Sequence, residues 1–139
     1  MLIDFHSHTT SSDGLLTPAE LVLRAVERRV DVLAITDHDT TAGIAAARQT
    51  IAELNLPLLL INGIEISSGW ENHEIHVVGL RMDIEHPALQ AFIQGQSEKR
   101  EARAIEMGLR LEKKRIMGAY EGAKVLAGEA EVTRAHFAR

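Results

Sequence analysis

Short apolar segments alternate with amphipathic segments through residues 1–80, and this alternation constrains the fold more than any other feature of the sequence. The short apolar segments favour β-strands, and the amphipathic ones have the residue spacing of α-helices. Strands are expected at residues 2–6, 32–35, 58–66 and 74–80, and helices are expected from Thr17 onward and at about residues 42–54. The order strand, helix, strand, helix, strand, strand predicts an α/β fold with a largely parallel sheet and covering helices.

The starts of both helices carry local signals. Thr17 can cap the first helix, Pro18 suits its first position, and Glu20 completes a capping box. Thr40 or Thr41 is the expected cap of the second helix.

The character of the sequence changes after Pro87. Residues 88–117 are rich in good helix formers and predict a long helix, which shorter helical segments follow at about 119–127 and 133–139. We therefore divide the chain into residues 1–85, which hold the strands, and residues 86–139, which are helical. The last helical pattern reaches Arg139 without a Gly or Pro to end it, so the chain is expected to be truncated there.

Composition excludes several classes of protein. The chain is 45% hydrophobic and 25% charged, which is typical of a globular domain, and it has no cysteine for disulfides, thiolate zinc sites or a cysteine nucleophile. A net charge of −5 argues against binding to duplex nucleic acid, although metal ions can still bring phosphates to an acidic chain. With no segment suited to a membrane span or a signal peptide, we expect a cytoplasmic protein without membrane contacts.

The first candidate site residues follow the first expected strand. His6 and His8 are two apart, so an extended backbone directs both side chains to one face, where they can bind one ion. Asp13 lies in the following loop. The alternative is a pair of surface histidines with an aspartate in a turn.

The second group is Thr36-Asp37-His38-Asp39, which begins where the strand at 32–35 ends. Functional sites of α/β sheets form at this end of the strands. Asp37 or Asp39 could instead cap the next helix, and we expect one of them to do so. A capping role for one of the aspartates does not explain why a histidine stands between them at position 38.

Glu65 and His76 lie within the next two expected strands. A buried carboxylate is unfavourable unless it is paired or bound to metal, but the alternation of Glu65 with Ile64 and Ile66 also fits a side chain that faces solvent. His76 stands in a β-branched segment, where a hydrogen-bonded core histidine is the alternative to a ligand. Three nearby polar residues are interpreted as loop or turn residues: His73, Glu74 and His86.

Each expected strand therefore carries an imidazole or a carboxylate at or near its C-terminal end, and this recurrence predicts a metal site. Nitrogen and oxygen ligands suit Mn, Fe or Zn and do not distinguish among them. The mixture of carboxylates with histidines favours more than one ion, because a glutamate can bridge two.

In order along the chain, these motifs resemble the PHP (polymerase and histidinol phosphatase) family: His6-x-His8, Asp13, Thr36-Asp37-His38-Asp39, Gly63-x-Glu65 and His76-x-x-Gly79. Residues 118–123 and the motif Thr133-Arg134-x-His136 look like one branch of this family. That branch comprises bacterial phosphoesterases that act on 3',5'-nucleoside bisphosphates and trim short RNA from the 5' end.

The resemblance implies a fold and a set of ligands. The fold would be the N-terminal part of a distorted seven-stranded β/α barrel with a helical insertion. The cofactor would be two or three divalent ions, most often Mn, with Glu65 as the bridge. The implied metal ligands are His6, His8, Asp13, His38, Glu65 and His76. Arg134 and His136 would line the substrate pocket. Members of this branch are longer, and a further His and an Asp-x-His pair that complete their metal site have no counterpart here.

The implied reaction is the hydrolysis of a phosphate ester by water that metal ions activate. Three residues are assigned to catalysis: Asp37, His38 and Glu65. Asp37 would act by orienting His38. A small nucleotide or a short single-stranded RNA would be the substrate. Two alternatives remain: a PHP phosphatase for another substrate, such as histidinol phosphate, and a truncated, inactive fragment that binds metal or nucleotide. The sequence does not predict the oligomeric state.

Overall fold

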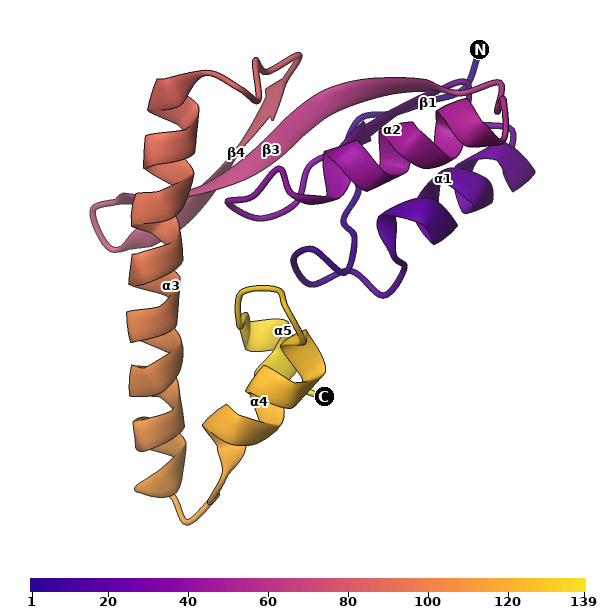
Figure 1. Ribbon diagram of the computed structural model, residues 1–139. Coiled ribbons are helices and arrows are strands. Elements are labelled where there is room, and N and C mark those ends of the chain that lie inside the picture. The colour runs from indigo at the N-terminus through magenta and orange to yellow at the C-terminus, as the bar shows by residue number, and fades with distance from the viewer.

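The computed structural model describes residues 1–139 and contains a four-stranded sheet in the order β1-β2-β3-β4 (Figure 1). The parallel strands are β1 (Ile3–Asp4), β2 (Val32–Ile35) and the first part of β3 (Leu59–Trp70), whereas β4 (His73–Leu80) pairs antiparallel with β3. The predicted α/β class is confirmed. β1 is shorter than the expected strand at 2–6, so His6 and His8 lie beyond its last paired residue.

Two helices, α1 (Pro18–Glu27) and α2 (Gly43–Glu53), lie side by side against the parallel strands (Figure 1). They cover a core of buried aliphatic side chains that includes Val22, Ile44, Leu33, Ile35 and Leu60. The predicted capping box of α1 is confirmed, because the Thr17 side chain accepts from Glu20 N–H and Thr17 N–H donates to Glu20 at 2.8 Å. The predicted cap of α2 is wrong. Its N-cap is Ala42, with no side-chain hydrogen bond, and neither Thr40 nor Thr41 occupies that position.

Strand β3 changes partner at Gly63. Leu59–Asn62 pair with β2, and the rest of the strand, from Gly63 to Trp70, forms a hairpin with β4. A Cβ atom at position 63 would lie 2.8 Å from the Ile35 carbonyl oxygen and 2.8 Å from the Thr36 side chain, so only glycine allows this close approach. The continued strand carries Glu65 past the end of β2, where its backbone bridges to His38.

The C-terminal part is helical, as predicted, with different boundaries. α3 (Pro87–Glu112) ends before the expected residue 117, and the chain turns at Gly118, whose φ is +69°. α4 (Ala119–Ala127) and the single turn α5 (Arg134–Phe137) pack beside the C-terminal half of α3 (Figure 1). A small second core joins them through Ala104, Ala123, Ala127 and Val132. Even α3, the longest helix, lacks the apolar stretch that a bilayer crossing requires, and no other helix qualifies.

A buried ion pair connects α3 to the sheet. Asp39, which is 4% exposed, accepts hydrogen bonds from Ser67 N–H at 2.8 Å and from Arg100 Nε at 2.7 Å. Gln96 donates to the same carboxylate, and Arg100 Nη2 also donates to Ser67 Oγ at 2.7 Å. Burial would raise the pKa of Asp39, but the Ser67 N–H and the Arg100 charge outweigh it, so this pKa is lowered. The carboxylate of Asp39 thus connects three parts of the chain, which are the loop that follows β2, the strand β3 and the helix α3.

Removal of this carboxylate should therefore loosen α3. In Asp39→Ala, Arg100 keeps its charge without a partner, and breaking a buried pair in this way costs about 3–5 kcal/mol of unfolding free energy. Denaturant unfolding of the full-length protein measures the loss. The control Glu106→Ala removes an exposed partner of Arg110 within α3 and should change stability by less than about 0.5 kcal/mol. Equal effects of the two substitutions would contradict the structural role of Asp39.

Candidate metal centre

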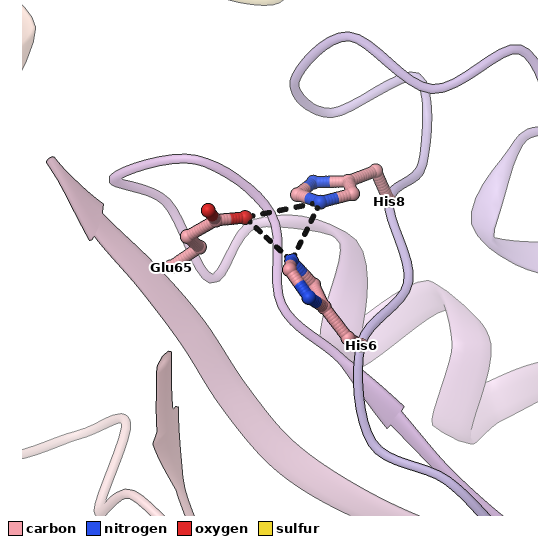
Figure 2. Close-up of side chains that lie close together, drawn as sticks. All are labelled: His6, His8 and Glu65. Carbon is pink, nitrogen blue, oxygen red and sulfur yellow. Dashed lines mark hydrogen bonds and ion pairs between the residues drawn. The ribbon is translucent and has the colours of Figure 1, made fainter. Parts of the chain in front are cut away.

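Glu65 lies at the centre of a cluster of imidazoles. Its Oε2 atom is 2.7 Å from His6 Nε2 and 3.1 Å from His8 Nε2 (Figure 2). Its Oε1 atom is 2.8 Å from His76 Nδ1. Glu65 is only 5% exposed, so the alternative in which it faces solvent is wrong. The physical reason is the continuation of β3 past β2, which directs this side chain toward the loop after β1.

The distances within the cluster suit metal coordination. His6 Nε2 and His8 Nε2 are 3.2 Å apart, and both approach the same oxygen of Glu65 (Figure 2). With metal–ligand bonds of about 2.0–2.2 Å, two donors on one ion lie roughly 3 Å apart. The expectation that an extended segment directs His6 and His8 to one point is therefore confirmed.

His38 and Asp13 extend the cluster. His38 Nε2 is 3.6 Å from Asp13 Oδ2, and His38 Nδ1 is 3.7 Å from Glu65 Oε2. Three overlapping groups result, in each of which one ligand atom per residue lies within 4.8 Å of the others: His6, His8 and Glu65; His8, Asp13 and His38; and His38, Glu65 and His76. All six residues expected as ligands are brought together, and three of them belong to two groups each. Their roles as ligands stay a prediction.

Two imidazole nitrogen atoms that form no hydrogen bond bear on whether the cluster can hold a metal ion. His8 Nδ1 and His38 Nδ1 are buried and have no hydrogen-bond partner. A buried polar atom without a partner is destabilising, and a metal ion can satisfy such an imidazole nitrogen. The donors are all nitrogen or oxygen atoms, a set that suits Mn, Zn or Fe. The residues present therefore fit divalent ions.

The electrostatics favour the protonation states that ligands need. Burial would raise the pKa of Glu65, but hydrogen bonds with His6 and His76 and the charge of His38 outweigh it and lower this pKa. Burial lowers the pKa of His38, although the nearby carboxylates of Asp13 and Glu65 oppose this. Near neutral pH the glutamate is thus ionised and His38 is neutral. Both forms are the ones that bind metal.

Asp37 has a different place from the one expected. Its buried carboxylate accepts hydrogen bonds from Thr9 N–H and Thr9 Oγ1, each at 2.7 Å, and from Ser12 Oγ at 2.6 Å. Burial raises its pKa, although these hydrogen bonds oppose the shift. Asp37 makes no hydrogen bond with His38, so the hypothesis that it orients His38 is wrong. It instead holds the loop that leads from His8 to Asp13. The expectation that Asp37 or Asp39 caps α2 is also wrong, because both carboxylates bind other segments.

A pocket of about 120 Å³ opens beside the cluster. Asp13, His38 and His76 line one side, and arginines from the helical part line the other. Arg134 is among them, and its Nη1 atom is 2.7 Å from Glu74. Arg134 is thus placed to meet an anion beside the candidate ligands. Its predicted contact with substrate stays a prediction.

Sequence reasoning missed Glu74 and Arg103. Glu74, at the edge of the expected strand 74–80, was interpreted as a loop residue, but it lies within β4, 3.2 Å from Arg103 and 3.6 Å from His76 Nε2. Burial would raise the pKa of Glu74, but Arg134 and Arg103 lower it. Both arginines are far from Glu74 in the sequence, so no local pattern could have indicated the contacts. His73 also lies in β4, and His86, expected in a turn, is the N-cap of α3.

His136 does not line this pocket. It is 3% exposed, and its Nδ1 atom accepts a hydrogen bond from Thr133 N–H at 3.0 Å. Burial lowers its pKa, and the charge of Arg139 acts in the same direction. The side chain closes the turn from Thr133 to His136, which contains Arg134. The geometry gives no direct support to its predicted contact with substrate, which stays a prediction.

The fold is an α/β domain in which clustered histidines and carboxylates could hold metal ions, next to a pocket that arginines line. The chain belongs to the PHP domain family, whose model matches residues 4–127. The predicted family is thereby confirmed.

Two curated relatives are similar along almost the whole chain. The 5'-3' exoribonuclease Rnm of Salmonella typhimurium is 60% identical over 139 residues, which are 100% of this chain and 47% of the relative. The 3',5'-nucleoside bisphosphate phosphatase of Chromobacterium violaceum is 44% identical over 99% of this chain and 48% of the relative. The chain thus spans about half the length of the curated relatives it matches.

Two solved structures share the fold. An amidohydrolase from Chromobacterium violaceum, solved with bound sulfate and no metal, has a TM-score of 0.92 and 41% identity over 100% of this chain and 49% of the other. A protein named as a metal-dependent phosphoesterase, from Bifidobacterium adolescentis, has a TM-score of 0.87 and 28% identity over 98% of this chain and 48% of the other. These likenesses support the α/β architecture.

If the cluster binds metal, ions should stabilise the folded protein. At a free Mn²⁺ concentration about one hundred times the Kd, the gain in unfolding free energy should be about 2.7 kcal/mol. Glu65→Gln removes a charge that two of the groups share and should remove most of this gain. The control Glu53→Gln, at the exposed end of α2, should keep it. Thermal unfolding of the full-length protein with and without Mn²⁺ measures the gain, and the same gain in all three proteins would contradict the site.

Proposed function

We propose that the protein to which this chain belongs is a metal-dependent phosphoesterase of nucleotides. Its reactions would be removal of the 3'-phosphate of 3',5'-nucleoside bisphosphates and trimming of short single-stranded RNA from the 5' end. The observation that carries this proposal is the convergence of four imidazoles and two carboxylates next to a pocket with arginines. The names of the relatives, an exoribonuclease and a bisphosphate phosphatase, agree with these two reactions.

Six residues would hold the ions: His6, His8, Asp13, His38, Glu65 and His76. Glu65 belongs to two of the three groups and is the one carboxylate that does so, with Oε2 facing His6 and His8 and Oε1 facing His76, so it is the residue best placed to bridge two ions. Two or three ions would bind, with Mn as the first candidate and Zn or Fe as alternatives. When bound, such ions polarise phosphoryl oxygens and lower the pKa of water toward neutrality.

The protein's own groups would position the substrate and keep the ligands in their binding forms. Glu65 remains ionised, and burial keeps His38 neutral. Asp37 contributes indirectly, because it holds the loop that carries His8 and Asp13. In phosphoryl transfer most of the catalytic effect comes from such positioning and from electrostatic stabilisation.

Arg134 would bind the phosphate. Only its Nη1 atom is engaged with Glu74, so the guanidinium keeps further donors for a bidentate contact with phosphate oxygens. Arg103 faces the same glutamate from α3 and lines the same pocket. The sulfate bound to the related amidohydrolase agrees with recognition of a tetrahedral anion in this fold.

The domain organisation follows from this assignment. Residues 1–85 would form part of a distorted seven-stranded β/α barrel that carries the metal ligands. Residues 86–139 would be a helical insertion that adds Arg103 and Arg134 to the substrate pocket. We assign the protein to the cytoplasm.

A panel of phosphate esters tests the proposed reaction. With Mn²⁺, the full-length protein should release phosphate from 3',5'-nucleoside bisphosphates and shorten 5'-phosphorylated RNA, and it should do so much faster than it hydrolyses histidinol phosphate. Excess chelator and Glu65→Gln should each abolish turnover, whereas Glu53→Gln should be as active as wild type. Activity that persists unchanged in chelator would exclude the metal mechanism, and preference for histidinol phosphate would exclude the nucleotide substrate.

The Arg134 assignment predicts a specific defect. Arg134→Ala removes a charge-assisted contact with phosphate, which is worth about 1.5–3 kcal/mol, so kcat/KM should fall about tenfold to a hundredfold. Steady-state kinetics on a nucleoside bisphosphate measure this loss, and Arg28→Ala, at the exposed end of α1, is the matched control. Arg134→Lys should recover only part of the activity, because lysine cannot form a bidentate contact. Wild-type kinetics in Arg134→Ala would remove it from the substrate site.

A further inference from the structure

A second, larger hollow adjoins the candidate metal centre. It is a groove of about 550 Å³ between the β3–β4 hairpin and α3. Glu74, Arg103 and Arg134 line both this groove and the smaller pocket, so the two are adjacent. Ligand sites in proteins have volumes of about 300–1,000 Å³, and the groove falls within this range.

One wall of the groove is a single face of α3. Phe92, Gln96, Lys99 and Arg103 line it at spacings that place successive residues on the same side of a helix. Phe92 is 38% exposed and Lys99 is exposed, whereas Gln96 is buried and binds the carbonyl oxygen of Ser67 at 2.8 Å. This face of α3 therefore exposes an aromatic ring and cations to solvent, and the buried Gln96 beneath them is held by its hydrogen bond to Ser67.

The opposite wall is the hairpin. Ser68, Gly69, Asn72 and His73 line it, and His73 is exposed. A Cβ atom added at Gly69 would meet nothing within 4 Å, so the strand is open toward the groove at this position. Gly69 pairs with Glu74, which places it near the end of the groove that meets the metal centre.

We propose that this groove binds the single-stranded RNA chain that follows the 5'-terminal nucleotide, an inference that rests on the proposed function. Proteins bind single strands with a cationic groove for the phosphates and aromatic side chains that stack on bases. Lys99, Arg103 and Arg134 supply the cations and outnumber the two carboxylates of the groove, Glu71 and Glu74, although the chain as a whole has a net charge of −5. Phe92 supplies the stacking surface.

The length of the groove supports a polymer. Phe92 and Arg103 are separated by about 16 Å along the helix axis, at roughly 1.5 Å per residue. Successive nucleotides of a stacked strand are about 3.4 Å apart, so this wall accommodates more than one nucleotide. A mononucleotide held at the metal centre would not extend to Phe92. The groove therefore distinguishes the two proposed substrate classes.

The test compares two substrates of the full-length protein. One is a 3',5'-nucleoside bisphosphate, and the other is a 5'-phosphorylated RNA of about five nucleotides, within the range of single-strand site sizes. Phe92→Ala and Lys99→Ala should each lower kcat/KM for the RNA about tenfold and leave the value for the mononucleotide within about twofold of wild type. Lys113→Ala, at the exposed C-cap of α3, is the matched control.

Two further measurements distinguish a defect in RNA binding from a defect in folding. Gly69→Phe places an aromatic ring in open space and should block binding of the RNA but not of the mononucleotide. This variant adds an obstacle to the groove, whereas Phe92→Ala and Lys99→Ala each remove a contact. Lys99→Ala should also reduce the slope of log(kcat/KM) for RNA against log salt by about 0.7. Normal turnover of the mononucleotide by each variant shows that the catalytic centre is intact.

The outcomes are distinct. The proposal is supported if Phe92→Ala, Lys99→Ala and Gly69→Phe each lower kcat/KM for the RNA and not for the mononucleotide. If the variants lower kcat/KM equally for both substrates, or for neither, the proposal that the groove binds RNA is wrong and the proposed function stays in place. Wild-type protein that hydrolyses only the mononucleotide would overturn both the groove and the proposed trimming of RNA, and it would leave the phosphatase reaction in place. Wild-type protein that hydrolyses neither substrate would overturn the proposed function, and the groove proposal with it.

Discussion

One buried carboxylate, that of Glu65, determines how the candidate centre is built. A charge with 5% exposure must be compensated, and the imidazoles of His6, His8 and His76 approach it from separate segments of the chain. The backbone of Glu65 is held as firmly as its side chain, because its N–H donates to the Asp37 carbonyl and its carbonyl accepts from Asp39 N–H. The loop after β2 and the continued strand β3 are therefore fixed to each other at the residue where the ligands converge.

The convergence is not simply a meeting of strand ends. β1 and β2 do end at the centre, but β4 runs antiparallel, and His76 lies opposite Ser67 in the middle of the hairpin. The C-terminal residue of β4, Leu80, pairs with Gly63, four pairs away from His76 along the ladder. His76 reaches Glu65 because the hairpin continues β3 over the ends of its neighbours, and the close approach at Gly63 permits this continuation.

Local patterns predicted much of this arrangement. The capping box at Thr17, the paired direction of His6 and His8, and the position of His38 after a buried strand follow from residue type and spacing. The remaining contacts join residues that are distant in the sequence, such as Glu74 with Arg134 or Asp39 with Arg100, and no local periodicity encodes them. The role of Asp37 was missed for the same reason, because its partners Thr9 and Ser12 lie 28 and 25 residues away in the sequence.

The helix α3 connects stability with the surface beside the site. Arg100 is nearly buried and binds Asp39, whereas its neighbours Lys99 and Arg103 are turned to the groove and the pocket. Because the buried pair fixes the rotation of the helix about its axis, it also fixes where these exposed cations lie relative to Glu74 and His76. The ion pair in the interior and the charges on the surface are therefore one structural unit, because the position of the cations depends on the contact between Asp39 and Arg100.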